Sequence, residues 1–166
     1  MMMIPLTRGA VAIVDASDFP VLSAYKWRLQ KCGSGLDYAV RSSPRNKGEK
    51  RTEILMHREI MCCPKRLTVD HINKNGLDNR RSNLRIATQS QNNANALSRR
   101  KTRSGLRGVT PDERSGGRRW LARLSVNNQL VLLGTFSSAE EAHSAYVSSH
   151  INHHGEFSSY WAGRNE

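Results

Sequence analysis

Two adjacent residues in the middle of the chain, Asp70 and His71, are of types that can act together, one on a metal ion and the other on water. They end a short apolar run and precede a polar loop, which returns through Asn83 to a predicted helix that contains Asn92. Carboxylate and amide oxygens suit a hard divalent cation such as Mg²⁺, and a neutral imidazole nearby can deprotonate water. On chemistry alone, the plainer interpretation, two polar loop residues, would hold more often than not.

The elements that would position these residues are short. Apolar or alternating runs predict strands over residues 11–14, 25–29, 38–41 and 84–86. An apolar segment over 54–61 is ended by Pro64. Thr88 and Gln91 fit a capping box, in which the hydroxyl and the amide satisfy backbone groups of the first turn, and they predict that a helix starts there.

The last third of the chain shows a different pattern of three strands followed by a helix. The predicted strands cover residues 105–110, 119–125 and 129–136, with turns over 112–117 and 127–128. Two overlapping capping boxes begin at Ser137 and Ser138, and small residues recur at helical spacing up to Gly155. A helix face of small residues can lie close to a sheet, so we expect a three-stranded sheet that carries one helix.

Positive charge is concentrated around these elements. The 166 residues include 26 Lys and Arg against 14 Asp and Glu, and ten of the twelve net positive charges lie between residues 79 and 123. Eleven arginines and one lysine stand there against Asp112 and Glu113. The planar guanidinium suits phosphate and guanine contacts, so the charge favours a nucleic-acid partner over a merely solvated basic face.

Other functional classes are not supported by the composition. There is no apolar run near the roughly 20 residues that a membrane span needs. Pro5, Arg8 and Gly9 interrupt the first segment, so we expect no signal peptide and a cytoplasmic setting. The three cysteines lack CxxC spacing, which argues against a disulfide scaffold or a zinc ribbon. Four histidines could form a metal cluster, although a favourable interaction with a helix C-terminus is the plainer explanation; they are His143, His150, His153 and His154.

The run from Val69 to Arg85, followed by Asn92, closely resembles the HNH endonuclease family, in particular its phage and intron-encoded homing branch. The run reads VDHINKNGLDNRRSNLR. The upstream Met56-His57-Arg58 also resembles a segment that this branch carries before its motif. The resemblance covers about residues 54–97 and implies a small ββα-metal nuclease core.

The same resemblance implies roles for individual residues. His71 would be the general base, Asp70 and Asn92 the metal ligands, and Asn83 the residue that orients the loop of the base. One divalent ion, Mg²⁺ or Mn²⁺, would be the cofactor, and no structural zinc is expected because the paired CxxC sites are missing. The neighbouring phosphates would be gripped by Arg80, Arg81 and Arg85. His57 and Asn79 could be either structural or catalytic.

Residues 105–157 resemble a second family, the ethylene-response-factor (Apetala-type) DNA-binding domain. The matching features are LRGV, WLARL, LGTF and the Ala-rich helix that ends at His154-Gly155. In that family a sheet lies in the major groove, and the residues carried over as DNA contacts are Arg107, Arg119, Trp120 and Arg123. Trp120 fits the core equally well. Leu132 stands where many plant members of that family have Trp. The DNA sequence that those members recognise therefore cannot be transferred to this chain.

Together these features predict an α+β chain of two modules that acts as a metal-dependent, site-selective DNA endonuclease. The expected parts are a nuclease domain over 1–97, a basic linker over 98–104, a DNA-binding domain over 105–157 and a tail over 158–166. Within the nuclease domain, N-terminal strands cover 1–53 and the HNH core 54–97. The expected partner is double-stranded DNA, without a membrane or a small-molecule cofactor, bound by a monomer or a DNA-induced dimer. The alternatives are a non-catalytic DNA-binding regulator and an RNA-binding or RNA-cleaving protein.

Overall fold

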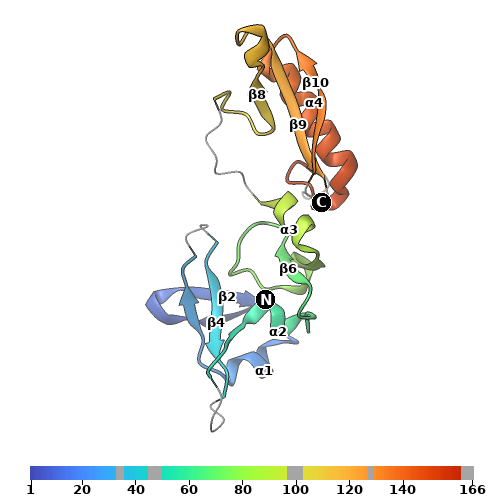
Figure 1. Cartoon of the computed structure of the whole chain (residues 1–166). Coiled ribbons are helices and arrows are strands. Elements are labelled where there is room, and N and C mark those ends of the chain that lie inside the picture. Colours follow the sequence, from blue (N-terminus) through green and yellow to red (C-terminus); the bar gives the residue numbers. More distant parts are fainter. Residues whose placement is uncertain (33–35, 45–49, 97–102, 127–128, 162–166) are drawn as a thin grey trace. The chain divides into compact units, whose positions relative to one another are not determined.

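The structure is a computed structural model that describes residues 1–32, 36–44, 50–96, 103–126 and 129–161 (Figure 1). Most of the predicted linker, residues 98–102, the predicted turn at 127–128 and the end of the tail, 162–166, lie outside the described residues. The chain divides into two compact units, Met1–Asn92 and Asn93–Glu166, and the boundary along the sequence falls within one helix. The predicted α+β class is confirmed, since small sheets and a few helices alternate along the chain. No helix among the described residues is both long and apolar enough to cross a membrane.

The N-terminal unit contains three small antiparallel sheets. The first pairs β1 (Met2–Pro5) with β2 (Val11–Val14), and the second has the order β3 (Arg28–Gln30), β4 (Tyr38–Ser42), β5 (Glu53–Leu55). The third pairs β6 (Thr68–His71) with β7 (Leu84–Ala87). The helical elements are η1 (Thr7–Gly9), α1 (Phe19–Ser23), α2 (Met56–Ile60) and η2 (Arg81–Asn83). They are followed by α3 (Gln89–Asn95), so that β6, β7 and α3 give the expected ββα order.

The core of this unit explains the spacing of its apolar residues. The alternation in β2 buries Ala12 and Val14, which pack with Trp27 and Met56 from later elements. Trp27, which also donates from Nε1 to the carbonyl of Leu22 at 2.8 Å, precedes β3 rather than lying in it. The predicted strand over 25–29 is therefore shorter and later than expected. The predicted apolar segment 54–61 is divided between the end of β5 and α2.

The C-terminal unit is the predicted three-stranded antiparallel sheet with one helix. The sheet has the order β10 (Gln129–Phe136), β9 (Trp120–Val126), β8 (Val109–Pro111), and it packs against α4 (Ala139–His154). The unit also has two short 3-10 helices. One, η3 (Glu113–Ser115), lies between β8 and β9, and the other, η4 (Gly155–Phe157), follows α4. The predicted helix start is confirmed, because Ser138 Oγ accepts from Glu141 N at 3.1 Å and the Glu141 carboxylate accepts from Ser137.

Candidate active site

Asp70 and His71 end strand β6, and both are buried, with 4% and 3% of their surface exposed. The antiparallel register with β7 pairs Asp70 with Arg85 and His71 with Leu84. Successive side chains of a strand point to opposite faces, so the carboxylate and the imidazole have different neighbours. The β6–β7 hairpin therefore fixes two buried polar groups, side by side in sequence, in two distinct environments.

The Asp70 carboxylate is held by Arg85. Nε and Nη2 of Arg85 donate to Oδ2 of Asp70 at 2.8 and 2.7 Å, and the side chains are only 5% (Asp70) and 12% (Arg85) exposed. A buried carboxylate needs such a compensating positive charge. A phosphate contact was predicted for Arg85. In the structure Arg85 is the ion-pair partner of the proposed metal ligand, and the phosphate contact stays a prediction.

The imidazole of His71 lies in a cluster of three rings. Its ring centroid is 4.9 Å from that of His57 in α2, with an edge-to-face angle of 89°, and 5.8 Å from that of Tyr38 in β4. Tyr38 and His57 are themselves 5.2 Å apart. Burial lowers the pKa of His71, while the neighbouring Asn79 side chain and the carboxylates of Asp70 and Asp78 oppose this shift. The lowered pKa favours the neutral imidazole, which is the form that can accept a proton from water.

His57 is the histidine that the sequence analysis left open. It is 6% exposed, and burial, followed by the neighbouring His71 and Arg58, lowers its pKa to about 3. Among the described residues its Nδ1 atom is buried without a hydrogen-bond partner. His57 is therefore neutral and rigidly placed beside His71. The cluster also contains Tyr38, whose pKa is raised by burial and then by the charges of Cys32 and Asp70. Nothing in the sequence singled out Tyr38 beyond its place in a strand.

The loop that follows His71 is held together by asparagine side chains. Oδ1 of Asn83 accepts from the backbone N–H of Asn73 at 2.9 Å, and Nδ2 of Asn83 donates to the carbonyl of Asp78 at 2.7 Å. Asn73 and Asn75 form further turns by accepting from backbone N–H groups two residues later. Asn83 thus ties together both ends of the loop next to the candidate base, which supports the orienting role expected for it.

The two remaining arginines of the motif, Arg80 and Arg81, form ion pairs with carboxylates. Nε and Nη2 of Arg80 donate to Asp78 at 2.8 and 2.6 Å, which lowers the pKa of Asp78. Arg81 pairs with Asp18 at 2.9 and 2.7 Å, and its backbone N–H donates to Asp15. About half of the Arg81 side chain (53%) and 39% of that of Arg80 remain exposed. Both therefore keep more of their side chain exposed than Arg85, and their phosphate contacts stay a prediction.

Asn92, the second expected metal ligand, lies in α3 and is half-buried. The predicted capping box at the start of this helix is confirmed: Gln91 N donates to Thr88 Oγ1 at 3.3 Å, and Gln91 Oε1 accepts from Thr88 N at 2.8 Å. The backbone N–H of Asn92 donates to the carbonyl of Thr88 at 3.0 Å, so its position in the helix is fixed. The role of its side chain at a metal stays a prediction.

Asp70 supplies a carboxylate, the type of ligand that Mg²⁺ prefers, and in the structure this carboxylate is paired with Arg85. Mg²⁺ is usually held by one or two carboxylates together with waters and substrate phosphates, without an all-protein cage. The described residues contain no cluster of three or more His, Cys, Asp or Glu that could hold a metal by themselves. A site built from Asp70, an asparagine and a bound phosphate is compatible with this. The Arg85 guanidinium occupies Oδ2 of this carboxylate, so a metal ion would have to compete with it or share the carboxylate.

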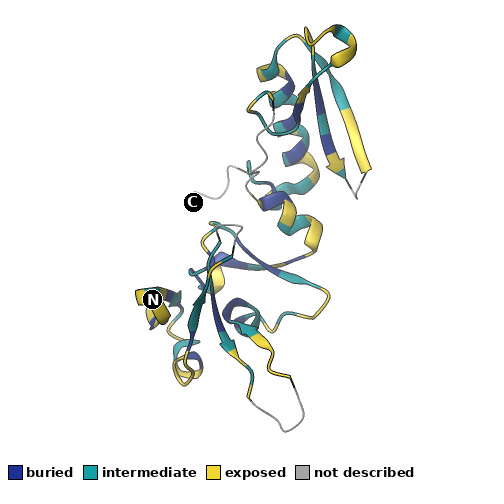
Figure 2. Ribbon diagram, turned by 60° about the vertical axis from the view of Figure 1, so that its left-hand side comes forward, coloured by how far each residue is buried: buried dark blue, intermediate teal, exposed yellow. Residues whose placement is uncertain are grey.

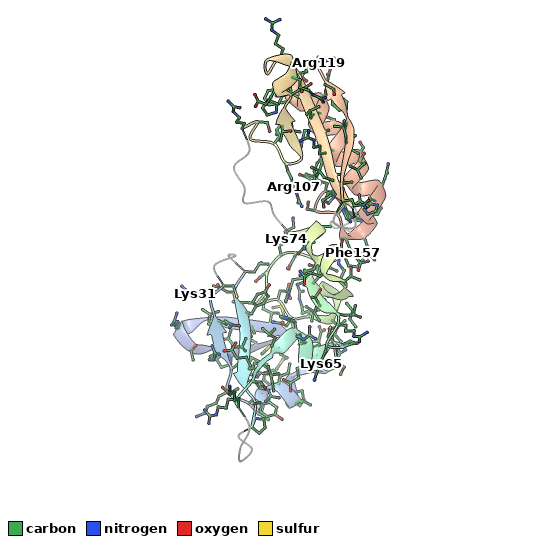
Figure 3. All side chains as sticks on the ribbon, in the orientation of Figure 1. Lys31, Lys65, Lys74, Arg107, Arg119 and Phe157 are labelled. Carbon is green, nitrogen blue, oxygen red and sulfur yellow. The ribbon has the colours of Figure 1, made fainter. Side chains whose placement is uncertain are left out.

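The DNA contacts expected in the C-terminal unit differ in their surroundings. Trp120 packs against the core cluster beneath the sheet, which favours a place in the core over a contact with DNA. Arg107 donates to the carbonyl of Ala96 at 2.9 Å and to Ser159 at 3.2 Å, so it braces the backbone of its own unit. Arg119 is exposed and Arg123 is half-buried on the sheet. Figure 3 places Arg107 and Arg119 at opposite ends of the unit, so these two do not form one patch.

Comparison with known proteins finds a family match over the region that contains the β6–β7 hairpin. Residues 62–94 match the family model of HNH endonuclease. The chain is also 33% identical, over 108 residues, to an uncharacterized HNH endonuclease of Acanthamoeba polyphaga mimivirus; the match covers 61% of this chain and 50% of the viral protein. The chain thus spans about half the length of that curated relative, and no solved structure matches it. Over residues 62–94, which contain Asp70, His71, Asn83 and Asn92, the chain is therefore similar to HNH endonucleases.

Proposed function

We propose that the protein is a metal-dependent, site-selective DNA endonuclease of the homing type, with its centre on the β6–β7 hairpin. The observation that carries this proposal is the pair of buried residues Asp70 and His71, one held by Arg85 and the other in a ring cluster, beside a loop fixed by Asn83. The similarity of residues 62–94 to HNH endonucleases supports it.

The proposed reaction assigns a separate task to each residue. Neutral His71 takes a proton from the attacking water, since burial keeps the imidazole deprotonated. Asp70 and Asn92 would hold one divalent ion, Mg²⁺ or Mn²⁺, which when bound stabilises negative charge on the phosphate and the leaving oxygen. Asn83 holds the loop that follows the base. Arg80 and Arg81, each partly exposed, would bind phosphates next to the one that is cleaved.

We further propose that the C-terminal unit binds the DNA target. Between residues 103 and 136 the sequence has six arginines against Asp112 and Glu113, whereas the helical side carries Glu140, Glu141 and Glu156. This separation of charge gives the sheet side the sign that attracts phosphates. The likeness of residues 105–157 to a DNA-binding domain that reads the major groove with a sheet supports the same assignment, as do the exposed Arg119 and the partly exposed Arg123.

Plasmid nicking tests this function. Supercoiled plasmid, including one that carries the native locus, is incubated with the purified protein and Mg²⁺ or Mn²⁺, or with a chelator. We expect nicked or linear product only with the metal. His71→Ala should lower the rate by about 10²-fold or more while DNA binding persists. His153→Ala, an exposed histidine of the other unit, is the matched control and should cut like the wild type. Duplex binding without any metal-dependent cleavage would favour the non-catalytic regulator, and preference for single-stranded RNA the RNA-directed alternative.

A further inference from the structure

The sheet of the C-terminal unit has one face on its core and one face turned away from it. Val109, Ala122 and Leu124 belong to the core cluster. In the sheet, Val109 of β8 and Gly134 of β10 lie opposite Ala122, and Val131 of β10 lies opposite Leu124. Residues that lie directly opposite each other in a ladder share a face, and successive residues alternate between faces. The rows that alternate with these form the outer face: Thr110, Leu121 and Thr135 in one row, Arg123 and Leu132 in the next, and Ser125 and Leu130 in the third. Leu121 is buried although it lies on this face.

The outer face is divided into a charged part and an apolar part. On the β8–β9 side, a hollow is lined by Arg103, Arg114 and Arg123 together with Thr110 and Leu121, and by Pro111, Asp112 and Glu113. Arg103 pairs with Glu113 and Arg114 with Asp112, so Arg123 is the arginine of this hollow that lies on the sheet itself. On β10, Leu130 is 67% and Leu132 is 53% exposed, and Figure 2 shows this first half of β10 as exposed. Leu132 lies directly opposite Arg123, and Leu130 opposite Ser125. An arginine and a leucine thus stand side by side on the same surface.

The two exposed leucines contribute little to the fold. Neither belongs to the core cluster, which takes Leu133 and Phe136 from the same strand. Large exposed apolar side chains that are adjacent on one face usually mark a binding surface. The surrounding charge points to the partner, because arginines dominate this side of the unit and the acidic residues of α4 lie in the element on the other side of the sheet. A polyanion that exposes apolar groups between its phosphates could contact both the arginines and the leucines of this face.

Duplex DNA has such groups in its major groove, where each thymine presents a C5-methyl. We propose that Leu130 and Leu132 read thymine methyl groups of the target, next to an Arg123 that contacts a guanine edge or a phosphate. This inference rests on the proposed function, and it adds the chemical class of the bases that β10 selects.

The spacing of a strand fits this assignment. Side chains two residues apart on one face are about 7 Å apart, and base pairs of a duplex are stacked at about 3.4 Å along each strand. Leu130 and Leu132 therefore match methyl groups about two base-pair steps apart. Arg123, across the ladder from Leu132, lies about 5 Å away and falls on the same or the adjacent step. The predicted target thus contains two thymines at this spacing beside the position contacted by Arg123.

Replacement of thymine by uracil tests the proposal, because it removes the methyl group and leaves the phosphates and base pairing unchanged. The full-length protein is first used, with chelator present, to select tight binders from a random duplex pool. The selected duplexes are then made with deoxyuridine in place of thymidine, and both forms are titrated. Each buried methyl should contribute about fourfold to affinity, so the uracil duplex should bind the wild type roughly tenfold more weakly.

The matched variant is the double substitution Leu130→Ala and Leu132→Ala. It should bind the thymine duplex as weakly as the wild type binds the uracil duplex, and it should not distinguish the two. Val21→Ala, which shortens an exposed apolar side chain of the N-terminal unit, should retain full discrimination. Circular dichroism verifies that the double variant is folded, as expected for exposed side chains.

Three results would overturn the inference. The wild type could bind uracil and thymine duplexes equally, or the double variant could keep the wild-type discrimination. The double variant could also bind like the wild type but lose a self-association seen by sedimentation, which would make β10 an interface between two copies. Each of these leaves duplex binding intact, so the proposed function survives. Failure of the wild type to bind any duplex would overturn the proposed function itself.

Discussion

Asp70 and Arg85 lie directly opposite each other on β6 and β7, and two nitrogens of the guanidinium contact the same oxygen, Oδ2, of the carboxylate. Because the pair is buried, the charge of the proposed metal ligand is balanced within the protein. A metal ion that binds Asp70 must share the carboxylate with Arg85 or displace the guanidinium from it. Arg85 therefore influences both the stability of the hairpin and its affinity for a cation.

Removal of Arg85 should be costly. Arg85→Ala leaves a buried carboxylate without its partner, and such losses typically lower the free energy of unfolding by about 3 kcal/mol. The matched control is Arg28→Ala, which breaks the surface pair with Glu53, whose side chains are 40% and 50% exposed, and should cost at most about 1 kcal/mol. Urea titrations of both variants measure the difference. Equal losses would mean that the Asp70–Arg85 pair is no more important than a surface pair.

The two asparagines of the motif should separate stability from metal binding. Asn83→Ala removes two buried hydrogen bonds of the loop and should lower the free energy of unfolding by about 2–3 kcal/mol. Asn92 is half-buried in a helix, so Asn92→Ala should change that free energy by less than about 1 kcal/mol. If Asn92 is a metal ligand, its variant should nevertheless bind Mn²⁺ about tenfold more weakly in calorimetric titrations. Unchanged Mn²⁺ affinity in Asn92→Ala would remove it from the metal site.

The sequence predicted best those helices and strands that carry a local signal, such as a capping residue or a strand-like apolar run. The capping boxes at Thr88 and Ser138 and the alternating runs of β2, β9 and β10 are all found in the structure. What the sequence could not show depends on distant contacts. At Gly108 the backbone has φ 78°, and a Cβ atom would lie 2.0 Å from the ring of Tyr146 in α4. The sequence predicts a strand over residues 105–110 there, whereas β8 begins only at Val109, after this glycine. The helix that closes over Gly108 could not be identified from the sequence.

The candidate site shows the same division. Asp70, His71, Asn83 and Asn92 could be named because their types and spacing form one motif in the sequence. The residues that contact them in the structure could not be named from the sequence. Arg85 looked like a surface cation, although the β6–β7 register places it opposite a buried carboxylate. Tyr38 reaches the base from a strand about thirty residues upstream, where its neighbours predict only alternation.

The surroundings of His71 predict the pH dependence of cleavage. Only the neutral imidazole can accept the proton of water, and burial lowers the pKa of His71 below its ordinary value of about 6.5. The base therefore stays active at pH values where an exposed histidine would be protonated, and the rate should fall only below about pH 6.5. Nicking rates measured at saturating Mg²⁺ from pH 5 to pH 8 show at which pH the rate begins to fall. A decline that begins above pH 6.5 would contradict the buried, neutral base.

Buried neutral histidines should also make the fold sensitive to acid. Burial lowers the pKa of His57 to about 3, whereas the same histidine in the unfolded chain titrates near 6.5. Above pH 6.5 the proton is absent from both states, so the full stability is present. As the pH falls from 6.5 toward 3, the unfolded chain binds a proton that the folded chain does not, and each pH unit costs about 1.4 kcal/mol.

Replacement of His57 should remove this part of the acid sensitivity. His57→Gln should change stability less steeply than the wild type between pH 6.5 and pH 4.5, with a difference of about 2–3 kcal/mol across that range. Urea titrations of the two proteins at several pH values measure the slopes, and the variant loses some stability at every pH because a packed ring is removed. Parallel curves for wild type and His57→Gln would show that His57 is protonated as readily in the folded protein as in the unfolded chain.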